Sequence, residues 1–200
     1  MKRICVMLFS AFYVSVSFAA VDSGLVVNAE KYLNSVTGLT GDFVQTNNGK
    51  KEQGNFSMLR PGRVRLDYKN MPVQLMADGS DLYFYDKSLD QITTVPLTST
   101  PAGILIRKKI DLRNADINVI DTIDGKSTFA LKMNLRGQEG LGNMTVTFNK
   151  KPLGLNSWTI FDAVGNKTDV QFKNLKTKKY YDLCIGFTNG QFSFANKIRK

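Results

Sequence analysis

Short runs in which apolar and polar residues alternate fill most of the chain between residues 39 and 95. Successive side chains of a β-strand point to opposite faces, so this alternation predicts strands with one buried face and one exposed face. Turn-forming pairs such as Asn48-Gly49, Pro61-Gly62 and Asp78-Gly79 separate the runs, which is typical of an antiparallel meander. The expected strands of this part are 39–45, 53–59, 63–68, 73–77, 82–85 and 91–95.

Two amphipathic helices are expected beside the strands. The first is N-capped by Asp22 or Ser23 and ends near Gly38. Its apolar positions, at helical spacing, are Leu25, Ala29, Leu33 and Val36. The second is short and interrupted, with Thr100 as N-cap and Pro101 at its first position. Its apolar contacts are Ile104 and Leu105, and three cations follow at 107–109, where they favour a helix C-terminus.

Strands resume after the second helix, at 117–122, 129–135, 144–149, 155–161 and 167–172, with a last strand at 183–187. A closed or nearly closed sheet of ten or eleven such strands encloses more space than its own side chains fill. Two amphipathic helices with no other partner would then cover the opening. The sequence therefore predicts a mainly β fold with an apolar interior under a helical lid.

The N-terminus has the form of an export signal. Lys2 and Arg3 are followed by an almost uninterrupted apolar stretch from Ile4 to Phe18, and Ser17 and Ala19 are small residues at the two positions that a signal peptidase recognises. We expect cleavage near Ala19/Ala20, with residues 1–19 as signal peptide and 20–200 as one domain. Removal of Lys2 and Arg3 lowers the net charge from +10 to +8. An exported basic protein is expected to meet anionic membranes or acidic partners, and no nucleic acid.

The chain contains no histidine, which excludes the common catalytic triads, proton shuttles and zinc sites. Besides Cys5 in the signal there is only Cys184, which is flanked by Leu183 and Ile185 and is expected to act as a small buried hydrophobe. No glycine-rich phosphate loop is present. We therefore expect no enzyme, no catalytic residue, no metal and no cofactor.

Arg60 is an arginine on the apolar face of a strand. Phe56 and Met58 lie four and two residues before it, so all three side chains share one side of the sheet. A buried guanidinium needs acceptors, and the carbonyls at a helix end are the best unpaired ones in a small protein. The alternative is an arginine that extends from the strand end to solvent. A helical lid beside this strand end would favour the first interpretation.

Several segments of the chain resemble the periplasmic outer-membrane lipoprotein carrier proteins (LolA). They are 39–45 (LTGDFVQ), 54–61 (GNFSMLRP), 78–85 (DGSDLYFY) with Asp90 and Gln91, 100–105 (TPAGIL), and 158–162 (WTIFD) with Gly165 and Thr168. The resemblance implies an incomplete, half-open antiparallel β-barrel of about 10–11 strands with an α-helical lid. It implies that Arg60 holds the lid closed, that Leu33 and 104–106 belong to the lid, and that no catalysis occurs.

The implied function is a periplasmic chaperone that binds the acyl chains of lipoproteins in a hydrophobic cavity and carries them from the inner to the outer membrane. Its expected partners are acylated lipoproteins, an inner-membrane lipoprotein-releasing transporter and an outer-membrane acceptor, and we expect a monomer. The expected cavity residues, which alternate along the strands, are Phe56, Met58, Val64, Leu66, Leu75 and Phe84. The same residues would equally suit a filled core.

Two other functions remain open from the sequence. One is a regulatory module of the same fold that senses lipid or lipoprotein and acts on a membrane partner, which a second domain would favour. The other is a small outer-membrane barrel, which usually ends in an aromatic residue, whereas this chain ends in Lys200.

Overall fold

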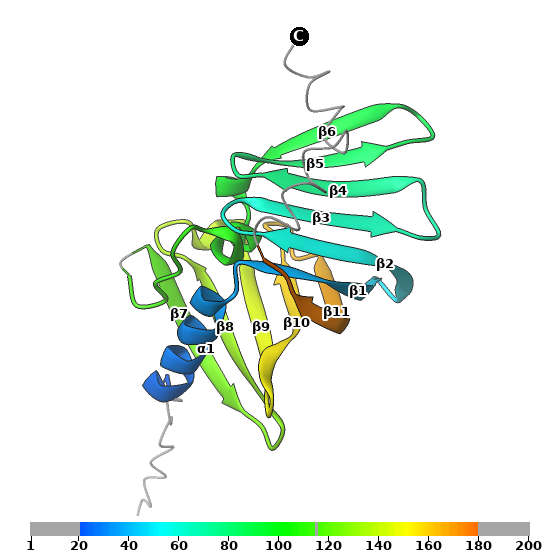
Figure 1. The fold of residues 1–200 in the computed structure, drawn as a ribbon. Coiled ribbons are helices and arrows are strands. Elements are labelled where there is room, and N and C mark those ends of the chain that lie inside the picture. Colours follow the sequence, from blue (N-terminus) through cyan, green and yellow to red (C-terminus); the bar gives the residue numbers. More distant parts are fainter. Residues whose placement is uncertain (1–20, 115, 180–200) are drawn as a thin grey trace, which may run out of the picture.

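The computed structural model describes residues 21–114 and 116–179. In this part of the chain eleven strands form one antiparallel sheet in the order β6-β5-β4-β3-β2-β1-β11-β10-β9-β8-β7 (Figure 1). Strands β6 and β7 lie at its two ends and do not pair with each other, so the barrel stays open. The predicted mainly β fold, an incomplete antiparallel barrel of about 10–11 strands, is confirmed.

The first half of the sheet comprises β1 (Gly38–Asn47), β2 (Lys50–Leu59), β3 (Arg63–Tyr68), β4 (Val73–Asp78), β5 (Asp81–Asp86) and β6 (Gln91–Pro96). The second half comprises β7 (Ile117–Asp124), β8 (Thr128–Leu135), β9 (Asn143–Lys150), β10 (Leu153–Phe161) and β11 (Lys167–Thr177). Each half is a meander of sequential neighbours, as the turn-separated alternation predicts. The strands of the two halves run in clearly different directions in Figure 1.

The two meanders are joined where β1 pairs with β11, strands that lie far apart in the sequence. Phe43 stands opposite Phe172 on one side and opposite Gly54 on the other. A Cβ atom at Gly54 would lie 2.0 Å from the Asp67 carbonyl oxygen and 2.7 Å from the Phe43 ring. Glycine at this position therefore lets the Phe43 ring pack edge-on against Tyr68, at a centroid distance of 5.1 Å.

Helix α1 (Ser23–Ser35) lies against the second half of the sheet, where it contacts β7 and β8 (Figure 1). Asp22 is its N-cap, and the Asp22 carboxylate accepts from the Gly24 and Leu25 amides at 2.7 and 3.2 Å. The helix buries Val26, Ala29 and Leu33, while Leu25 is only half-buried. The buried stripe therefore begins one residue later than the sequence pattern predicts.

The second predicted helix is a pair of 3-10 turns, η1 (Leu97–Ser99) and η2 (Pro101–Ile106), rather than an α-helix. Thr100 is the N-cap of η2, as expected, and its hydroxyl accepts from the Ala102 amide. Pro101 supplies no N–H and Gly103 weakens an α-helix, so six residues between two loops adopt the tighter form. A Cβ at Gly103 would lie 2.8 Å from the Leu97 carbonyl oxygen, so glycine lets the two turns pack together.

Three of the sequence expectations fall outside the described residues: the signal peptide with its cleavage site, Cys184, and the strand at 183–187. Among the described helices, none is long and apolar enough to cross a membrane.

Candidate functional site

An apolar cavity of about 350 Å³ lies between the two halves of the sheet, with residues of η1 and η2 forming a further wall. Five of the six predicted cavity residues line it: Met58, Val64, Leu66, Leu75 and Phe84. Phe84 is 40% exposed, so it marks an open side. The opposite wall was not anticipated as cavity lining and consists of Met144, Trp158, Ile160 and Val170. The volume lies within the 300–1,000 Å³ typical of small-molecule sites.

Phe56, the sixth predicted residue, does not line the cavity. Its ring lies 4.6 Å from that of Phe172 and 5.9 Å from that of Trp158, in a filled part of the core. The alternation of side chains along the strand therefore predicted correctly that Phe56 points to the interior. Whether an inward side chain meets a void or another ring depends on the opposite wall, and here two aromatic side chains fill the space.

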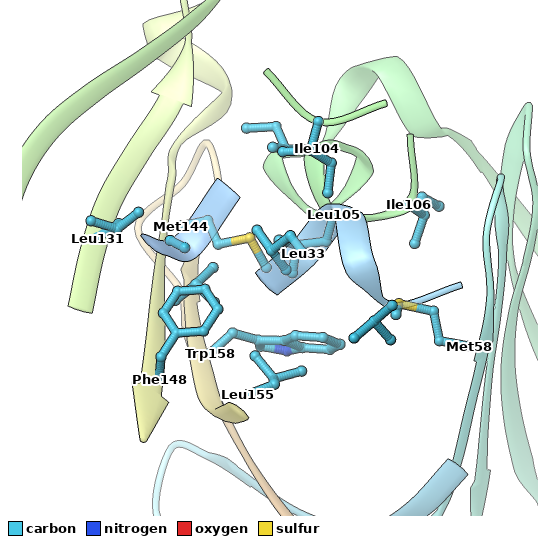
Figure 2. Close-up of a cluster of buried hydrophobic side chains, with 14 of the residues drawn as sticks. Leu33, Met58, Ile104, Leu105, Ile106, Leu131, Met144, Phe148, Leu155 and Trp158 are labelled. Carbon is cyan, nitrogen blue, oxygen red and sulfur yellow. The ribbon is translucent and has the colours of Figure 1, made fainter. Parts of the chain in front are cut away.

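The predicted lid residues take different places around this core (Figure 2). Leu105 lines the cavity together with Ala102 and Ile106, so η2 forms one of its walls. Ile104 is buried but lines a smaller pocket on the other side of η2. Leu33 is buried in the core and does not line the cavity. Figure 2 shows Leu33 and Leu105 close together, between Met144 of one wall and Met58 of the other.

Arg60 lies just beyond the end of β2 and is only 6% exposed. Its Nη1 group donates to the carbonyls of Leu33 and Val36 at the end of α1, the latter at 3.3 Å. Its Nε group donates to the Arg107 carbonyl at 3.0 Å, and Nη2 to the Lys108 carbonyl at 3.3 Å. One side chain of the sheet therefore bonds both helical segments, at carbonyls that helix geometry leaves without partners.

Burial lowers the pKa of the Arg60 guanidinium from its ordinary value, because desolvation disfavours the charged form. A guanidinium nevertheless stays charged at neutral pH, so the hydrogen bonds are charge-assisted. The backbone strengthens the same junction, since the Arg60 amide donates to the Thr37 carbonyl at 2.8 Å and the Gly62 amide to the Ile106 carbonyl at 2.7 Å.

Two polar residues of α1 also bond the segment that follows η2, and sequence reasoning missed them. The Asn34 carboxamide donates to the Ile110 carbonyl at 2.6 Å and accepts from the Ile110 amide at 3.0 Å. The Glu30 carboxylate accepts from the Leu112 amide at 2.9 Å and from Arg113 at 2.8 Å. Glu30 and Asn34 are four residues apart on α1, so one helix face binds the segment that follows η2. Their i, i+4 spacing was the only available signal.

The end of the cavity near the β1–β2 turn is polar. Gln45, Asn47 and Thr168 line it there, beside Tyr68. The Tyr68 hydroxyl donates to Gln45 Oε1 at 2.8 Å. Burial, with a smaller contribution from the Glu52 charge, raises the pKa of Tyr68 to about 12. Within the described residues no cluster of three metal-ligating side chains occurs. The site therefore offers apolar enclosure with polar groups at one end.

Solved structures with a similar course of the chain have low sequence identity. A LolA superfamily protein from Nitrosomonas europaea is 8% identical with a TM-score of 0.44, and the match covers 80% of this chain and 95% of that chain. MucB is 15% identical with a TM-score of 0.45, and the match covers 78% of this chain and 58% of that chain. Likenesses at this level say nothing about function.

Sequence comparison gives stronger similarity. An outer-membrane lipoprotein carrier protein from a serogroup C strain of Neisseria meningitidis is 28% identical over 172 residues, which cover 82% of each chain. A protein of the same name from Methylococcus capsulatus is 30% identical over 159 residues, which cover 74% of this chain and 75% of that one. The family model described as outer membrane lipoprotein carrier protein LolA matches residues 34–184, about three quarters of the chain. The chain therefore belongs to the LolA family of outer membrane lipoprotein carrier proteins.

Proposed function

We propose that this protein binds the acyl chains of lipoproteins in its apolar cavity and carries them through the periplasm from the inner to the outer membrane. The observation that carries the proposal is an apolar cavity of about 350 Å³, one wall of which belongs to a helical segment that a buried arginine bonds. The protein is not an enzyme, since its family is one of carriers.

The cycle follows from competition between closure and loading. In the closed, empty protein Arg60 bonds the ends of α1 and η2, and Leu33, Leu105 and Ile106 cover the apolar interior. An anchor with more than one acyl chain needs more room than one small-molecule site, so the lid has to move on loading. That movement breaks the Arg60 hydrogen bonds, and their re-formation favours release.

The N-terminal export signal supports a periplasmic location for the mature protein. The donor would be an inner-membrane lipoprotein-releasing transporter and the acceptor an outer-membrane protein, with the carrier acting as a monomer between them. A shuttle of this kind needs a site that excludes water from acyl chains without holding them tightly. A lid held by a few hydrogen bonds meets both needs. Each bond contributes only about 0.5–3 kcal/mol, so the lid can cover the site and still open.

Ligand binding and cargo identification test the proposal. A fluorescent acyl ester should bind the folded monomer with about 1:1 stoichiometry, and its emission should rise in the apolar site. The protein purified from its own periplasm should carry acylated proteins that mass spectrometry identifies. A folded monomer that binds no acyl ligand and carries no acylated protein would overturn the proposal.

A further inference from the structure

The cavity is polar at one end only, and strand register places the polar groups together. Gln45 stands opposite Val170, and Asn47 stands opposite Thr168, on the neighbouring strands β1 and β11. All four of these residues line the cavity. Amide and hydroxyl side chains therefore lie together at one end of the cavity, which the last residues of β1 and the first residues of β11 form.

Gln45 is held in one orientation by Tyr68. The Tyr68 hydroxyl donates to Gln45 Oε1 at 2.8 Å, and the Tyr68 ring is itself fixed by its edge-on contact with Phe43. With its oxygen engaged, the carboxamide presents its Nε2 group as a donor. In the described part of the chain, no acceptor bonds this Nε2 group.

An acyl chain brings an acceptor that matches this donor. The ester or amide carbonyl that joins an acyl chain to its anchor only accepts hydrogen bonds, and its burial without a donor is costly. Small-molecule sites generally combine apolar walls with a few polar groups that fix the ligand's orientation. Glu52 stands opposite Gln45 on β2 and pairs with Lys50 at 3.1 Å. A free carboxylate suits this end less well than a neutral carbonyl, because its burial costs more.

We propose that Gln45 Nε2 donates to the carbonyl oxygen of a neutral fatty acyl ester or amide, with Tyr68 as the positioning residue. The polar end then holds the anchor's linkage while the hydrocarbon runs along Leu66, Leu75 and Trp158 towards η2. The inference rests on the proposed function for the nature of the ligand. It adds that the cavity binds the carbonyl group of the acyl linkage as well as the hydrocarbon chain.

Ligands matched in chain length provide the test. Methyl palmitate and hexadecyl methyl ether differ only by the carbonyl oxygen, and palmitate supplies the free carboxylate. Affinities are measured by displacement of an apolar fluorescent dye from the full mature protein. One neutral hydrogen bond predicts that the wild type prefers the ester over the ether by roughly 2- to 10-fold. Palmitate should bind more weakly than the ester at neutral pH.

Gln45→Leu should abolish the ester preference and leave ether affinity equal or higher. Tyr68→Phe should reduce the preference in part, because the Gln45 carboxamide is then free to rotate. The matched control is Gln53→Leu, the same change at an exposed position of β2, which should behave as wild type. Retention of the preference in Gln45→Leu, or tighter binding of palmitate than of the ester, would overturn the inference. If the wild type binds ester and ether equally, only this subsite fails, whereas absence of binding by all three ligands contradicts the proposed function as well.

Discussion

Replacement of Arg60 by leucine tests the lid most directly. The substitution removes every hydrogen bond that the guanidinium makes to Leu33, Val36, Arg107 and Lys108, and to the Asn34 side chain. It also leaves those carbonyls unpaired in the closed state, while leucine makes the interior more apolar. Each of these changes favours the open, loaded form over the closed, empty one.

The hydrogen-bond lengths give the size of the expected shift in the closed-to-open equilibrium. Three of the bonds are 3.3 Å long and are weak, so we count the bonds to the Leu33 and Arg107 carbonyls alone. Hydrogen bonds to charged groups contribute about 1.5–3 kcal/mol each, and the lowered pKa of Arg60 shows that desolvation opposes them. A net change of about 3 kcal/mol shifts the closed-to-open equilibrium roughly a hundredfold. Because ligand competes with closure, apparent acyl affinity should rise and delivery should slow.

A transfer assay that scores uptake and delivery separately provides the measurement. Arg60→Leu should take up lipoprotein and hand it on poorly, with its fold verified by circular dichroism. Arg60→Lys should be intermediate, since an ammonium keeps the charge but lacks the fork of donors that spans both segments. The matched control is Arg63→Leu, on the face of β3 opposite to Val64 and Leu66, which line the cavity. Delivery by Arg60→Leu at the wild-type rate would refute the role assigned to this arginine.

Three further substitutions test the cavity wall, the hydrogen bonds between α1 and the segment after η2, and the buried tyrosine. Leu75→Asp places a charge in the cavity wall and should weaken acyl binding at least tenfold, whereas Leu89→Asp, at an exposed turn, should not, as dye titration can show. Asn34→Ala should speed hydrogen exchange of the backbone amide that it bonds by roughly 2- to 10-fold, because about one neutral hydrogen bond is lost there, while exchange in Asn28→Ala, an exposed position of α1, should match wild type. The pKa of Tyr68 is raised to about 12, above its ordinary value near 10, so its neutral form stabilises the fold below pH 10 and that contribution, about 2–3 kcal/mol, is lost between pH 10 and 12. Denaturant titrations should show a smaller loss of stability over this interval in Tyr68→Phe, and equal losses in both proteins would contradict the burial argument.

Local features of the fold could be predicted from the sequence because their causes are local. Asp22 caps α1 through amides two and three residues away, and Thr100 caps η2 through the amide of Ala102. Alternation with period two, interrupted by turn residues, is sufficient to locate the strands, and β3 has the predicted bounds of 63–68. These interactions span only a few residues, so a linear pattern contains them.

Other features depended on which distant segments meet. The pairing of β1 with β11 has no local signal, since alternation is the same whichever strand lies beside it. Phe56 has the predicted face, yet Trp158 and Phe172 from the other half of the sheet decide that it packs in a filled core. Whether an inward side chain lines a cavity therefore depends on the distance to side chains of the opposite wall, which a local pattern does not contain.

The polar contacts show the same division. The position of Arg60 on an apolar strand face indicated that it required acceptors, because burial of an unpaired charge is prohibitive. Asn34, Glu30 and Gln45 gave no such signal, since polar side chains on a helix surface or near a strand end are normally solvated. The amino-acid pattern was sufficient to predict the strands between residues 38 and 177, the helix caps and the need of one arginine for hydrogen-bond acceptors. Which carbonyls, walls and amides meet depends on the tertiary structure, because those contacts join residues that are 24 to 138 positions apart in the chain.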